Sequence, residues 1–104
     1  MKRHSPAQQR ELKAAAASLY QAFLTLDTPA EVRQFLLDLC TPAELEAMVD
    51  RWWTASLLNE GRSYREISDI TGVSVTTIGR VARYMNMGEG GYRLALRREA
   101  AEQR

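Results

Sequence analysis

The chain has very little of the chemistry on which metal proteins and many enzymes depend. It contains one cysteine, Cys40, and one histidine, His4, among 104 residues. A single cysteine excludes an internal disulfide and a zinc site built from several cysteines. A single histidine, placed in the N-terminal segment, excludes a histidine cluster and gives no support to a nucleophile paired with a histidine base. We therefore expect no metal site and no enzymatic activity, and we expect Cys40 to be a small buried apolar residue.

Long apolar runs are also absent. No stretch approaches the roughly 18 consecutive apolar residues that a membrane-spanning helix requires. Hydrophobic residues make up 45% and charged residues 26% of the chain, as is ordinary in soluble proteins. The N-terminal segment is polar and lacks the apolar core of a secretory signal. These features predict a cytoplasmic protein that does not contact membranes, and the length fits one domain over residues 1–104.

The net charge of +1 is small, but the charges are unevenly distributed. Residues 1–60 carry six Lys and Arg against eight Asp and Glu, whereas residues 61–104 carry eight Arg against five acidic residues. No acidic residue lies between Asp69 and Glu89, and two arginines lie there. A basic segment of this kind favours an anionic partner, although the net charge alone does not indicate nucleic acid.

Signals for the start of a helix recur along the chain. Proline follows Ser5, Thr28 and Thr41, which is the order of an N-cap residue and the first helical residue. Glu31 and Glu44 complete the pattern of a capping box at the second and third of these sites. No alternation typical of strands competes with these signals. The sequence predicts an all-α fold of six helices.

The first predicted helix carries apolar residues at spacings of three and four, which places them on one face. These residues are Leu12, Ala16, Leu19, Phe23 and Leu26. A stripe of this kind has to be covered by another element.

A helix-turn-helix is predicted over about residues 63–84. The residues Ser63-Tyr64-Arg65-Glu66 form another capping box, Gly72 supplies the positive φ of a tight turn, and Ser74 is placed to cap the second helix. The side chains expected inside the angle between the two helices are Ile67, Ser68, Val73, Ile78 and Val81. The caps, the turn glycine and the inward-facing side chains all fit the same motif, and together they indicate a helix-turn-helix.

The outward face of the second motif helix is hydroxylic first and basic afterwards. Small side chains at a helix N-terminus can approach DNA closely in the major groove, and longer arginines reach farther. We therefore expect binding to double-stranded DNA. The candidate contacts are Arg65, Ser74, Val75, Thr76, Thr77, Arg80 and Arg83.

Several alternatives stay open at this point. Arg80 and Arg83 could pair with guanine, hold phosphate or form an ordinary solvated face. Arg65 could contact phosphate or form a local ion pair with Glu66 or Asp69. The motif as a whole could bind a protein partner instead of DNA. The adjacent tryptophans at 52 and 53 are expected in core and dimer packing rather than as a platform for bases.

Five features stand out together: Leu39-Cys40-Thr41-Pro42-Ala43-Glu44-Leu45, Arg51, Gly61, Tyr64-Arg65-Glu66-Ile67, and the stretch from Thr71 to Val81. Together they resemble the Trp repressor superfamily, most closely its small bacterial Trp-repressor-like branch of the YerC/YecD type. The resemblance spans about residues 12–97. It implies an intertwined homodimer in which N-terminal helices, within residues 1–27 here, interlock. It also implies transcriptional repression through DNA contacts in the predicted motif.

The resemblance also bears on a small-molecule effector. In the Trp repressor, tryptophan lies between two arginines that match Arg51 and Arg80, so these two residues mark a possible effector pocket. The residue after the second arginine is glycine in that protein and Val81 in this chain. A branched side chain should fill the space that the indole needs. We expect no cofactor and no tryptophan corepressor, and other effectors stay open.

Overall fold

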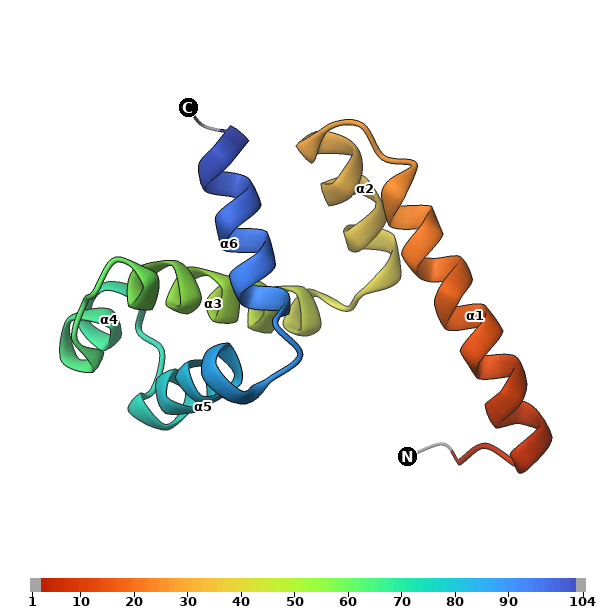
Figure 1. Ribbon diagram of the computed structural model, residues 1–104, viewed down its shortest axis with the longest axis horizontal. Helices are drawn as coiled ribbons and strands as arrows, with labels where there is room; N and C mark the ends of the chain where they lie inside the picture. Colours follow the sequence, from red (N-terminus) through yellow and green to blue (C-terminus); the bar gives the residue numbers. More distant parts are fainter. Residues whose placement is uncertain (1–2, 103–104) are drawn as a thin grey trace. The chain divides into compact units, whose positions relative to one another are not determined.

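The computed structural model describes residues 3–102, and over this range it contains helices and no strand, as predicted (Figure 1). The helices are α1 (Pro6–Leu24), α2 (Pro29–Leu39), α3 (Pro42–Asn59), α4 (Tyr64–Thr71), α5 (Val75–Met87) and α6 (Gly91–Glu102). The first two residues of the predicted dimerisation segment and the last two of the chain lie outside the described residues. Internal contacts form two compact units, one ending at Thr41 and one beginning at Pro42. A single domain stays a prediction.

Local caps explain where the first two helices begin. The Ser5 hydroxyl accepts the N–H of Gln8 at 3.1 Å, and the Gln8 side chain accepts the N–H of Ser5 at 2.7 Å. The Thr28 hydroxyl likewise accepts the N–H of Glu31 at 3.2 Å. The Glu31 carboxylate, however, accepts the N–H of Asp27 at 2.8 Å. The capping box predicted at this site is therefore formed only in its first half, because Glu31 reaches one residue farther back.

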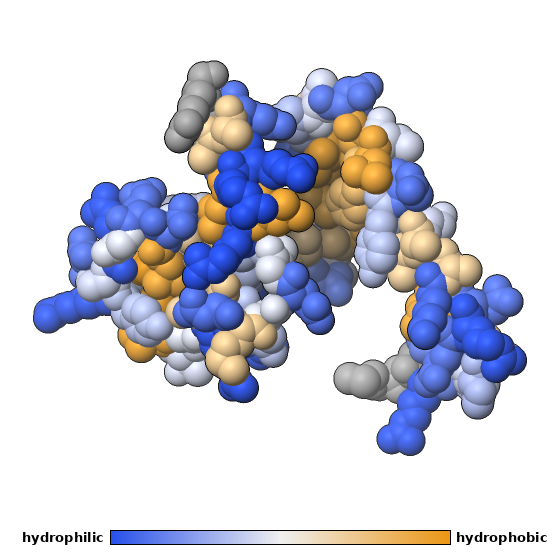
Figure 2. Space-filling view, viewed as in Figure 1, coloured by the Kyte–Doolittle hydropathy of each residue, from blue (hydrophilic) through white to orange (hydrophobic). Residues whose placement is uncertain are grey.

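The N-terminal unit consists of α1 and α2, and none of its described residues is buried. The rings of Phe23 and Phe35 meet edge to face, with centroids 5.2 Å apart and an interplanar angle of 65°. Leu12 remains 48% exposed, and Leu26 lies beyond the end of α1. Cys40, expected to be buried, is only half-buried at the end of α2. Hydrophobic surface is open to solvent over α2 (Figure 2).

The C-terminal unit holds the buried core. Helix α3 contacts α4, α5 and α6, and α5 also contacts α4 and α6. One core cluster joins α3 to α4 and α5 through Leu57, Ile67, Val73 and Ile78. A second cluster joins α3 to α5 and α6 through Ala55, Val81, Met85 and Leu96. Helix α5 contributes to both clusters, so its inner face is fixed along most of its length.

Candidate nucleic-acid interface

Helix α4 begins at the capping box that the sequence predicts. The Ser63 hydroxyl accepts the N–H of Glu66 at 3.2 Å, and the Glu66 carboxylate accepts the N–H of Ser63 at 3.1 Å. The backbone and side-chain hydrogen bonds from Ser63, together with Arg62, lower the pKa of Glu66. Arg62 approaches Glu66 at 3.5 Å and Glu60 at 3.6 Å. Glu66 is therefore engaged by Ser63 and Arg62.

The turn between α4 and α5 has the geometry that was predicted from Gly72. This residue has a φ of 75°, in the left-handed region, and its N–H donates to the carbonyl of Ser68 at 2.9 Å. The Thr71 hydroxyl donates to the carbonyl of Ile67 at 2.7 Å and accepts the N–H of Val73 at 3.0 Å. The role of Thr71 was missed from sequence, although a threonine directly before the glycine was a visible signal.

The predicted interior of the motif is confirmed. Ile67 and Ile78 are fully buried, Val81 is 1% exposed and Val73 is 7% exposed. Ser68, expected at a close approach of the helices, is half-buried. The second motif helix is thus held by its apolar face, and the opposite face is available to solvent.

Ser74 and Thr77 form the hydrogen bonds that cap the start of α5. The Ser74 hydroxyl accepts the N–H of Thr77 at 3.2 Å and donates to the Thr77 hydroxyl at 3.1 Å. Thr77 is half-buried, whereas Thr76 is exposed and Val75 is 56% exposed. The Thr77 hydroxyl keeps its own hydrogen for donation. Of the candidates at the start of α5, Val75 and Thr76 are the most open to a ligand.

The three candidate arginines are all exposed. Within residues 3–102, the side chains of Arg65 and Arg83 make no hydrogen bond or ion pair, so the local ion pair considered for Arg65 is not formed. The guanidinium of Arg80 lies 5.7 Å from the ring centroid of Tyr84. These cationic groups have no carboxylate partner in the described part of the chain, which leaves their charge available to an anion.

The outer surface of α5 has a recess beside Arg80 and Arg83. It has a volume of about 500 Å³ and is lined by Thr76, Gly79, Arg80, Arg83 and Tyr84. Arg51, the other residue of the possible effector pocket, is exposed and does not line this recess. Sequence reasoning did not identify Tyr84 as part of the surface.

The far end of α5 is fixed by a contact that sequence reasoning did not anticipate. Arg93, in the first turn of α6, donates from Nε to the carbonyl of Met85 at 2.8 Å and from Nη2 to the Asn86 side chain at 2.6 Å. Carbonyls in the last turn of a helix lack partners within the helix, and a guanidinium is well suited to satisfy them. Arg93 therefore attaches the end of α5 to α6.

Other features of the structure have a less direct relation to this surface. Trp52 packs against the second core cluster, and Trp53 is 42% exposed. Among the described residues, no group of three or more His, Cys, Asp or Glu side chains could hold a metal ion. No described helix combines the length and apolar character that crossing a bilayer demands.

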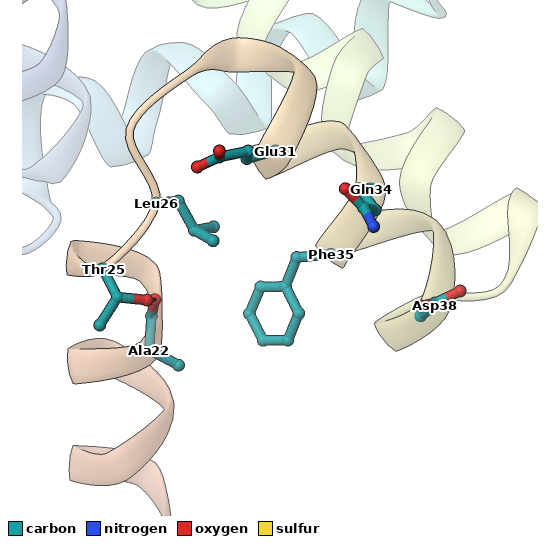
Figure 3. Close-up of a pocket in the computed structure, with 7 residues that line it drawn as sticks. All are labelled: Ala22, Thr25, Leu26, Glu31, Gln34, Phe35 and Asp38. Atoms are coloured by element: carbon teal, nitrogen blue, oxygen red, sulfur yellow. Dashed lines mark hydrogen bonds between the residues drawn. The ribbon is translucent and has the colours of Figure 1, made fainter.

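A pocket of about 460 Å³ opens between α1 and α2, with the ring of Phe35 directed into it and Leu26 and Ala22 on the opposite side (Figure 3).

Comparison with known proteins gives a consistent result. Residues 14–100 match the model of the family described as Trp repressor protein. The Bacillus subtilis protein YerC, which is uncharacterised, is 39% identical over 80 residues, 77% of each chain. A TrpR-like protein from Eubacterium eligens superposes with a TM-score of 0.79 at 37% identity, over 84% of this chain and 90% of that one. A candidate Trp repressor from Staphylococcus aureus has the same TM-score at 36% identity, over 84% and 87%.

Proposed function

The chain belongs to the Trp repressor family of DNA-binding regulators, and we propose that it is a cytoplasmic, homodimeric transcriptional repressor that binds a specific DNA site through α4 and α5. The observation that carries this proposal is the outer face of α5, where Arg80 and Arg83 are exposed without a carboxylate partner in the described residues while the inner face is fixed in the core. Members of this family are generally not enzymes, and we propose the same here.

The proposed dimer is supported by the surface of the N-terminal unit. Large hydrophobic side chains on α1 and α2 are substantially exposed, namely Leu12, Tyr20, Leu24, Leu37 and Leu39. A second copy of the chain would cover these apolar side chains. The apolar floor of the pocket in Figure 3 belongs to the same unit and could receive a side chain of that copy.

Selection of bound fragments from random duplex DNA tests the function. We expect a two-fold symmetric site whose half-sites lie one helical turn, roughly 34 Å, apart, because two recognition helices of a dimer enter successive major grooves. A salt titration on the selected site should give a log-log slope near about −5 for on the order of six phosphate contacts. Affinity that does not respond to salt, with no enriched sequence, would instead indicate a protein partner for the same motif.

L-Tryptophan is not expected to act as corepressor. Val81, which follows Arg80, is 1% exposed and packs with Ala55 and Met85 in the second core cluster. The resemblance implies space for an indole next to the residue after the second arginine, and we propose that the branched side chain of Val81 fills it. Isothermal titration of the protein with L-tryptophan should therefore show no heat of binding, and DNA affinity should be the same with and without it. A clear, saturable heat would contradict this proposal.

A further inference from the structure

Gly79 lies in the second turn of α5, where glycine is an unfavourable residue. For two other glycines, at the turn of the motif and at the end of α5, the fold itself explains the residue type. Gly72 has a positive φ, and a Cβ on Gly88 would clash with the carbonyl oxygen of Tyr84. Gly79 has no positive φ, and a Cβ there would meet only the Tyr64 ring, at 3.9 Å, which is an ordinary contact. Nothing in the described structure requires glycine at this position.

The space beside Gly79 is surrounded by hydrogen-bond donors. The residue lines the recess on the outer face of α5 with Thr76, Arg80, Arg83 and Tyr84. The hydroxyl of Thr76 and the two guanidinium groups are hydrogen-bond donors, and no carboxylate lines the recess. The contact of Arg80 with the Tyr84 ring restrains one of these guanidinium groups before any ligand binds.

We propose that Gly79 is the point at which a DNA backbone phosphate approaches α5 most closely, held between Arg80, Arg83 and Thr76. This inference rests on the proposed function and adds the chemical group that the recess receives. A phosphate fits better than a base edge, because the lining offers two full positive charges and glycine has no side chain with which to read a base. Charge-assisted hydrogen bonds need short distances, so a side chain at 79 would weaken them by holding the phosphate away.

The substitution Gly79→Ala separates binding from stability. Alanine is a far better helix residue, so the melting temperature should rise by roughly 4 °C. The affinity for DNA should nevertheless fall by about tenfold, since charge-assisted contacts are lost. Phosphates carry no sequence information, so the loss should be about the same for the selected site and for random duplex. Gly91→Ala is the matched control, because nothing lies within 4 Å of a Cβ there, and its affinity should equal that of the wild type.

Each other outcome overturns the inference. If Gly79→Ala bound DNA with the same affinity as the wild type, no phosphate would approach α5 closely at Gly79. The proposed function would not be affected by that result. If affinity fell for the selected site but not for random duplex, the recess would receive a base edge and not a phosphate. A lowered melting temperature would show that the fold itself needs glycine at 79. A wild-type protein that binds no duplex at all would defeat both the inference and the proposed function.

Discussion

Replacing Arg80 and Arg83 together with alanine is expected to reduce the affinity for DNA by about a hundredfold or more. Each guanidinium is exposed and has no carboxylate partner in the described residues, so its charge is available to the nucleic acid. Losing two charge-assisted contacts in each protomer of the proposed dimer would remove a large share of the binding free energy. The measurement is a fluorescence anisotropy titration with the selected duplex at about 0.1 M salt. The salt dependence of binding should also become weaker.

The double substitution of Arg97 and Arg98 on α6 by alanine is the matched control. It removes the same charge from the C-terminal unit, but from residues that do not line the recess on α5. Its affinity should stay within about threefold of the wild type, because only general attraction changes. Helical circular dichroism should be the same for all three proteins. Equal losses in the two double variants would show that general charge, and not the face of α5, binds the DNA.

Shortening Ile78 to alanine is expected to lower the free energy of unfolding by about 2–5 kcal/mol. The side chain is fully buried and packs with Leu57, Ile67 and Val73, so its removal leaves a cavity where three helical segments meet. Urea denaturation followed by circular dichroism measures this change. The comparison should use one fixed protein concentration, since the stability of the proposed dimer would depend on concentration.

Val75→Ala provides the reference for this measurement. Val75 is on the same helix but 56% exposed, and its loss should change the unfolding free energy by no more than about 0.5 kcal/mol. If the two variants were equally stable, α5 would not be anchored through Ile78. The interior assigned to the motif would then be wrong.

Much of the motif could be predicted because its signals are local. A cap such as Ser63 with Glu66, or a glycine such as Gly72 at a positive φ, acts over three or four residues, and these features are found where the sequence predicts them. The burial of Ile67, Ile78 and Val81 follows from the same spacing. The predicted box at Thr28 was half wrong because two backbone N–H groups compete for the Glu31 carboxylate, and sequence spacing does not decide between them.

The sequence by itself determined the helices and the turn, because the hydrogen bonds and backbone angles that create them involve near neighbours in the chain. The tertiary structure decided which charged groups are left for a ligand. Arg93 of α6 reaches back to hold the end of α5, whereas Arg80 and Arg83 have no carboxylate partner in the described residues. These choices depend on how side chains from different turns and helices meet in space, and on the geometry that a guanidinium needs to form its hydrogen bonds.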